Sequence, residues 1–305
     1  MTQNTTLSLR QAKQSPCLQC DSACCCQLLI LERYPLVTLS DVDKTDFYLN
    51  FSDIEIVLDR GELTVYYSKP CRFFDTINRT CTIHNQPEQP AICVHYNPYS
   101  CFYKKLYEDK EQIRHGYIWL NRARLDRLCE HMEFDEHRTI TKAPDPGEII
   151  KEFNASFPYE RDHPTPPASP KAGESSSNAS SCRNCSALCC KSLLFYTNQP
   201  FDEGNLDYCT YSLGFPGVEY LVADHRWAIL VDARCNYLDA NDQCTVSQKE
   251  ERPLRCRYLN PLQCDIKRDI KYPNQLRVDY ENFPQVKQSV QTDEDGKITS
   301  MKMRS

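Results

Sequence analysis

An internal duplication, marked by cysteines, is the feature that most constrains the fold of this chain. Eight cysteines of a first copy recur in the same order in a second copy, at an offset of 165 residues for the first four pairs, 164 for the fifth and 163 for the last three. Of the nineteen cysteines, only Cys26, Cys129 and Cys209 are left over. Because the copies keep these thiols while most other positions differ, we infer that the thiols are their common working part. The candidate metal ligands are Cys17, Cys20, Cys24, Cys25, Cys71, Cys81, Cys93 and Cys101 in the first copy and Cys182, Cys185, Cys189, Cys190, Cys235, Cys244, Cys256 and Cys264 in the second.

The duplication divides the chain into two modules. The segment between them is rich in Pro, Ser and Ala and lacks apolar periodicity, which is typical of an extended linker. We therefore expect a first module over residues 14–156, a flexible linker over 157–181, a second module over 182–290 and a frayed tail over 291–305.

Short strands are predicted at matching places in both modules. Apolar runs at 27–31 and 192–196 and runs with β-branched and aromatic residues at 62–67 and 227–231 indicate these strands. Polar turns follow, each between two cysteines, so the flanking thiols of each turn should be brought close together.

A long helix is predicted in the first module only. Apolar residues recur at helical spacing over 105–133, which predicts one amphipathic helix there. Pro273 and Pro284 interrupt the equivalent stretch of the second module, so any helix there is short or absent. The expected fold class is therefore α+β, with two small cysteine-rich, metal-stabilised modules, little sheet, and an added long helix in the first.

Charge and hydropathy narrow the function classes. The chain has 36 basic and 42 acidic residues and a formal net charge of -6, so we expect no nucleic-acid partner. No run of eighteen apolar residues and no export signal occurs, so we expect no membrane contact and a cytoplasmic location. In a reducing compartment, cysteines at this density favour metal binding over disulfides.

The spacing of the cysteines is typical of thiolate-bound metal. On a helix, Cys17, Cys20 and Cys24 lie along one face while Cys25 points away, so we expect the first three to share a site with a distant thiol and Cys25 to join the downstream cysteines. Three alternatives stay open, namely a disulfide scaffold, structural zinc that replaces a missing core, and an iron–sulfur cluster. The expected cofactor is Zn or an iron–sulfur cluster, because both accept four thiolates in a tetrahedral arrangement.

The order of these motifs resembles a known family. Cys-x-x-Cys-x3-Cys-Cys, a tryptophan-bearing strand and Arg-Pro-x-x-Cys-Arg-x-x-x-Pro with a further cysteine are similar to the YkgJ-type cysteine-cluster proteins, a family described as zinc- or iron-chelating. The second copy matches the pattern more closely, since the first has Gln89, Ile92 and Val94 where the second has arginines. The resemblance implies metal binding and implies no particular reaction.

Three arginines of the second copy flank a cysteine of the candidate site. Arg252, Arg255 and Arg257 are candidate cofactor-binding residues, because guanidinium groups there could offset thiolate charge. Surface or capping roles are the alternative. His84 and His95 have no histidine counterparts in the second copy, and we expect them to be ordinary, partly exposed side chains.

Two functions from different classes fit these patterns. The first is a metal-binding protein without turnover, whose modules present surfaces to a protein or peptide partner. The alternative is an iron–sulfur-dependent enzyme or electron carrier acting on a protein or peptide, by analogy with a similar cysteine cluster in flagellin lysine-N-methylases. No Gly-rich phosphate loop, His-Glu-x-x-His or Gly-x-Ser-x-Gly motif occurs, so no catalytic residue is named.

Overall fold

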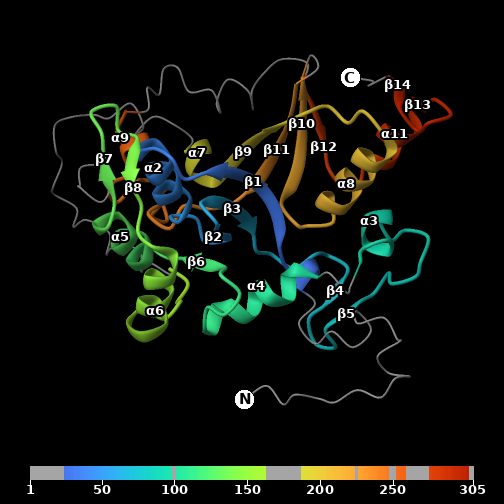
Figure 1. Ribbon diagram of the computed structural model, residues 1–305. Helices are drawn as coiled ribbons and strands as arrows, with labels where there is room; N and C mark the ends of the chain where they lie inside the picture. Colours follow the sequence, from blue (N-terminus) through green and yellow to red (C-terminus); the bar gives the residue numbers. More distant parts are fainter. Residues whose placement is uncertain are drawn as a thin grey trace, which may run out of the picture.

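The computed structural model describes residues 24–97, 101–162, 187–223, 226–246, 252–258 and 275–301. Helices and strands are mixed within these ranges, which confirms the α+β class. Two sheets lie side by side in the middle of the molecule, with helices around them (Figure 1). Below, the first copy means the described residues up to 162, and the second copy means those from 187.

The first sheet has four antiparallel strands in the order β1-β3-β2-β6. These strands are β1 (Leu29–Pro35), β2 (Ile54–Asp59), β3 (Glu62–Tyr67) and β6 (Ile118–Leu120). The two-residue turn between β2 and β3 places Arg60 and Gly61 at positive φ, which matches the twist of a tight hairpin.

The second sheet repeats the same order, as β12-β10-β11-β9. Its strands are β9 (Ser192–Thr197), β10 (Val218–Ala223), β11 (Arg226–Asp232) and β12 (Leu276–Val278). The strands predicted at 62–67 and 192–196 are confirmed almost to the residue. The expectation of little sheet was wrong, because the apolar runs of each copy pair with one another into a buried four-stranded sheet.

Matching helices follow the first strand of each sheet. These are α2 (Leu39–Tyr48) and α8 (Glu203–Leu213), and each begins at a side-chain cap. Thr38 accepts the backbone N–H of Asp41, and Asp202 accepts that of Asn205. One-turn helices α3 (Ala91–Val94), α7 (Leu188–Lys191) and α9 (Leu254–Tyr258) and the 3-10 turn η2 (Cys24–Cys26) carry cysteines.

The single helix expected over 105–133 was wrong. The segment forms α4 (Phe102–Glu111), strand β6 and α5 (Arg122–Glu130). The fully buried carboxylate of Asp109 accepts the backbone N–H groups of Arg114, His115 and Tyr117, and Gly116 has a φ of 94°. This tight loop ends the helix, and Trp119 then enters the sheet, fully buried.

Shorter elements complete the described chain. They are the hairpins β4 (Phe74–Asp75) with β5 (Thr80–Cys81), β7 (Glu133–Phe134) with β8 (Ile140–Lys142), and β13 (Val290–Thr292) with β14 (Ile298–Met301), and the helices α6 (Pro146–Ser156) and α11 (Phe283–Gln288). The tail expected to be frayed over 291–305 thus contains a hairpin through residue 301. The hairpin is fixed by contact with the chain before α8, where Ile298 N donates to Phe201 O at 2.8 Å. The helix expected to be short or absent is α11, which has six residues and starts at the Pro284 region.

One hydrophobic core runs through both copies. Leu29 and Val65 of the first sheet belong to the same buried cluster as Leu193 and Ile229 of the second. A smaller cluster lies on the other face of the first sheet, under α4, and contains Trp119. The two sheets therefore stabilise each other.

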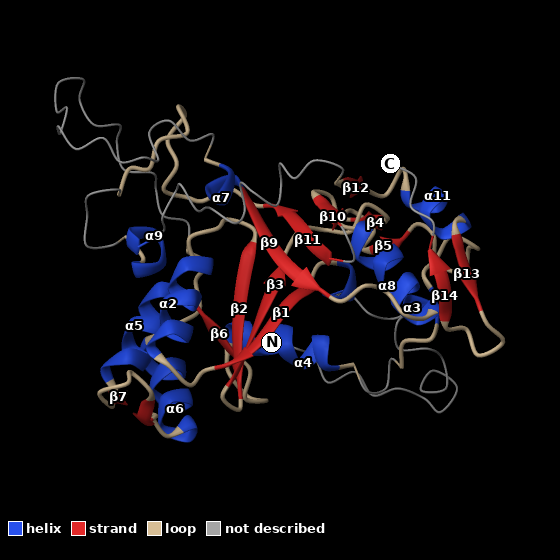
Figure 2. Cartoon of the chain, turned by 90° about the horizontal axis from the view of Figure 1, so that it is seen from above, coloured by secondary structure: helices blue, strands red, loops and turns tan. Residues whose placement is uncertain are grey.

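Backbone hydrogen bonds between the copies come in a matched pair. Arg72 N donates to Gly214 O at 2.8 Å, and Asn236 N donates to Asn50 O at 2.7 Å. Both donors follow a cysteine of their own copy, and both acceptors lie at the end of the helix α8 or α2 of the other copy. The copies are therefore exchanged about an approximate two-fold relation, with α9 beside α2 and α3 beside α8 (Figures 1 and 2).

Candidate functional site

Five cysteines of the first copy line one cavity. They come from η2, from the start and end of the β4–β5 hairpin and from α3, and we call them the first cysteine site: Cys25, Cys26, Cys71, Cys81 and Cys93. The cavity has a volume of about 30 Å³, which is room for an ion or one or two water molecules and too little for an organic substrate. Grouping Cys25 with the downstream cysteines agrees with the sequence-based expectation.

The register of the duplication is one residue different from the register read in the sequence. Leu29 pairs with Tyr67 in the first sheet, and Leu193 pairs with Val231 in the second. This register, at an offset of 164 residues, matches Cys25 with Cys189 and Cys26 with Cys190. The same backbone contact supports it, because Cys71 N donates to Cys26 O and Cys235 N donates to Cys190 O, both at 2.7 Å.

Cys26 was therefore wrongly left over by the sequence comparison. Pairing Cys24 with Cys189 and Cys25 with Cys190 followed the spacing from the upstream cysteines, and the extra residue lies in the Cys-Cys-Cys run itself. The signal that could have found this was the apolar run downstream, since its alignment with the second copy sets the offset to 164.

An equivalent group forms in the second copy. Each of its members changes the pKa of others in the group, so the thiols lie close together, and we call them the second cysteine site: Cys189, Cys190, Cys235, Cys244 and Cys256. Cys244 also bridges to Leu238, which closes the turn that the sequence predicts between Cys235 and Cys244.

The adjacent cysteines of each site have opposite pKa shifts. The Cys26 thiol donates a hydrogen bond to the Cys25 sulfur, and this bond lowers the pKa of Cys25 to about 7. The same bond, followed by burial, raises the pKa of Cys26. In the second site the Cys190 thiol likewise lowers the pKa of Cys189 to about 7, and the two sulfurs lie 3.9 Å apart. Each site thus has one accessible thiolate supported by a neutral neighbour.

The remaining thiols resist ionisation. Burial, followed by the charges of neighbouring cysteines, raises the pKa of Cys93 to about 12. Burial likewise raises the pKa of Cys256 to about 12 and that of Cys235 to about 11. A cation among these sulfurs would offset both the burial of the charge and the repulsion between thiolates.

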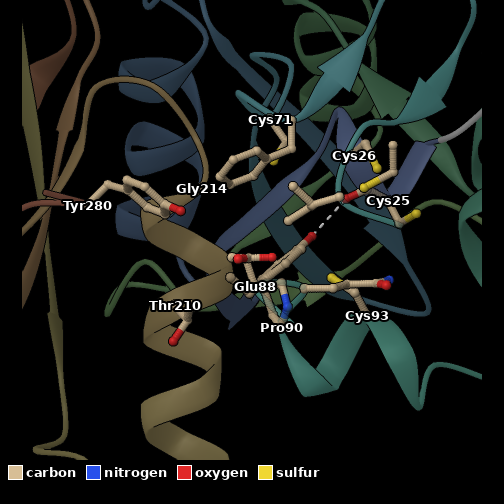
Figure 3. A pocket seen from close by; sticks show the side chains of 14 residues that line it. Cys25, Cys26, Cys71, Glu88, Pro90, Cys93, Thr210, Gly214 and Tyr280 are labelled. Carbon is tan, nitrogen blue, oxygen red and sulfur yellow. Dashed lines mark hydrogen bonds between the residues drawn. The ribbon is translucent and has the colours of Figure 1, made fainter. Parts of the chain in front are cut away.

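Helix α8 of the second copy forms one wall of the first cysteine site. Figure 3 shows Thr210 and Gly214 of this helix facing the cavity from the side opposite Cys25 and Cys93. The Tyr211 hydroxyl, also at the cavity, donates to Cys25 O at 2.9 Å and is shared with Leu28 O at 3.3 Å. No cysteine spacing indicates this wall, and the sequence analysis missed it.

Gly214 allows the close approach of this helix. A Cβ atom at residue 214 would lie 2.9 Å from Tyr211 O and 3.2 Å from the Cys71 sulfur. The backbone of α8 therefore reaches the site only because residue 214 has no side chain.

The three candidate arginines take different positions. At Cys256, where burial raises the pKa, the Arg252 guanidinium acts in the opposite direction, and at Cys189 it adds to the lowering by the Cys190 hydrogen bond. Arg255 points to the first copy, with its guanidinium carbon 5.9 Å from the ring centre of Phe47. Arg257 Nε donates to Arg252 O at 2.7 Å and so holds its own turn.

Some candidate ligands lie elsewhere. Cys101 precedes α4 and packs with Cys25 against the smaller hydrophobic cluster, and it is not among the residues that line the cavity. His84 and His95 are exposed, as expected. The candidates that lie outside the described residues are Cys17, Cys20, Cys182, Cys185 and Cys264, and of Cys24 only the backbone is described.

The described cysteines share a cavity without converging on one point. Within the described ranges, no group of three or more His, Cys, Asp or Glu side chains is arranged to hold a metal ion. Comparisons of the chain with protein-family models, with curated proteins and with solved structures find no match. Every helix in the described part of the chain is too short or too polar to cross a lipid bilayer.

Proposed function

We propose that this chain is a metal-binding protein with one thiolate-bound centre in each copy, holding Zn or an iron–sulfur cluster. The observation that carries the proposal is the first cysteine site, where five thiols from three separate segments line one small cavity. The repeat of the arrangement around Cys189 and Cys190 supports the same role in the second copy.

The chemistry of the donors fits soft metal ions. Thiolates are preferred ligands of zinc and of iron–sulfur clusters. The thiol with a pKa of about 7 in each pair, Cys25 or Cys189, would bind first, because it loses its proton near neutral pH. The resemblance to the YkgJ-type cysteine-cluster proteins supports the same class of ligand. Arg252 would offset thiolate charge in the second centre only.

Metal analysis of protein purified without oxygen tests this proposal. We expect bound metal in the wild type, and less of it in Cys71→Ser and in Cys235→Ser, which remove equivalent thiols from the two sites. Cys129→Ser is the matched control, because Cys129 is also half-buried and lies in α5, outside both sites.

The outcomes separate the alternatives. A brown sample with broad visible absorption identifies iron–sulfur centres and opens the reading as an electron carrier or iron–sulfur-dependent enzyme, whereas a colourless sample with stoichiometric zinc identifies a metal-binding protein without redox chemistry. Wild-type protein that stays metal-free after reconstitution with zinc or with iron and sulfide, or equal metal content in all three variants, would contradict the proposal.

A further inference from the structure

Two carboxylates cross from one copy to the other in the same way. Asp207 of α8 accepts the backbone N–H groups of Ala91, at 2.8 Å, and Ile92, at 2.6 Å, in the first copy. Asp43 of α2 accepts those of Leu254 at 2.7 Å and Arg255 at 2.9 Å in the second copy. The two aspartates are 164 residues apart and their acceptors 163, so the contact is one feature that occurs twice.

Each carboxylate holds the first turn of a very short helix. Helix α3 has only four residues, and its N-cap, Pro90, makes no side-chain hydrogen bond to it. Helix α9 has five residues and follows Pro253. A single turn is unfavourable without outside support, because it fixes several dihedral angles for one hydrogen bond. The aspartate of the other copy supplies that support by binding two N–H groups that have no partner within the helix.

The helix residue that follows each contact is a cysteine of the candidate site. Cys93 comes directly after Ile92, and Cys256 comes directly after Arg255. The two oxygens of one carboxylate bind two successive N–H groups, so they fix both the position and the direction of the backbone from which the sulfur projects. An asparagine can accept only one of these hydrogen bonds, because its NH2 group is a donor.

We propose that Asp207 is a positioning residue for the thiol of Cys93 and that Asp43 is the positioning residue for the thiol of Cys256. Each copy thereby controls the last cysteine of the opposite site. The effect on metal rests on the proposed function, whereas the effect on the backbone does not.

Hydrogen exchange of the metal-free, full-length protein tests the backbone effect. In Asp207→Asn we expect the amides of residues 91–94 to exchange roughly 5- to 30-fold faster, the factor for loss of a helix cap. The amides of residues 254–258 should be unchanged. Asp43→Asn is the matched variant and should give the opposite pattern. A general loss of stability would accelerate both helices in both variants.

Alkylation of the zinc-loaded protein, read cysteine by cysteine with mass spectrometry, tests the effect on metal. We expect Cys93 to lose protection in Asp207→Asn, with zinc bound about 10- to 100-fold more weakly at the first site, while Cys256 stays protected. Asp207→Glu, which keeps both oxygens, should restore part of the protection.

The failures are distinguishable. If the wild type binds no zinc, the proposed function fails and the exchange experiment still decides the role of the aspartates. If the wild type binds zinc but each variant changes only its own copy, or neither helix, the positioning role is wrong.

Discussion

Replacing Tyr211 with phenylalanine should destabilise the chain by about 1–3 kcal/mol, the range for a lost hydrogen bond to a buried group. The hydroxyl hydrogen is shared between Cys25 O and Leu28 O of the other copy, and Leu28 is fully buried, so water cannot replace it. The ring contacts are kept, including the edge-on contact with Phe215 at 5.4 Å between ring centres. The loss therefore measures the hydroxyl alone.

Urea unfolding under reducing conditions measures this loss. With a denaturant slope of about 3 kcal/mol/M, the midpoint should fall by about 0.3–1 M while the slope stays constant. Tyr258→Phe is the control, because Tyr258 is 82% exposed and its change should stay within about 0.5 kcal/mol. Equal midpoints for the two variants would refute the reasoning that the Tyr211 hydroxyl ties α8 to the cysteine run.

Three further predictions follow from the contacts between the copies. Co-expression of residues 1–170 and 171–305 as separate chains should give one soluble complex in size-exclusion chromatography, and stable, separate monomers would contradict the shared core. Gly214→Ala should cost about 1–3 kcal/mol in urea unfolding and lower the metal content of the first site, since its Cβ meets a backbone carbonyl at 2.9 Å and the Cys71 sulfur at 3.2 Å. Gly204→Ala in the same helix, whose nearest neighbour is 3.4 Å away, should leave both unchanged. Removal of metal with a chelator should leave the far-ultraviolet circular dichroism of the sheets in place and speed hydrogen exchange mainly between β3 and α3, where few side chains are buried; complete unfolding would show instead that metal, and not the shared core, holds the sheets together.

The strands could be predicted from the sequence because their signal is local. The run at 62–67 has β-branched and aromatic residues and coincides with β3. The long helix failed for a reason that periodicity does not contain. Apolar spacing continues through the loop after α4, but the loop is set by three N–H groups that converge on Asp109. A buried carboxylate that organises a turn leaves no repeating pattern in the sequence.

The candidate site was predictable in its residue types and only partly in its membership. Cysteine spacing placed Cys25 with the downstream thiols, and it left out Cys26, because one inserted residue among three consecutive cysteines cannot be located by counting. The wall from α8 could not be predicted at all. Thr210 and Gly214 look like ordinary helix residues until the second copy is seen against the first.

The exchange of helices also says what one copy would need on its own. A single copy has the cysteines but lacks the helix that closes its cavity and the aspartate that caps its last one-turn helix, so it would have to obtain both from a twin, as an isologous dimer does about a two-fold axis. Joining the halves in one chain relaxes the rule of such a dimer, in which every substitution occurs twice. Gly214 can serve one site while Asn50 stands at the equivalent place beside the other, and the two linings are free to differ.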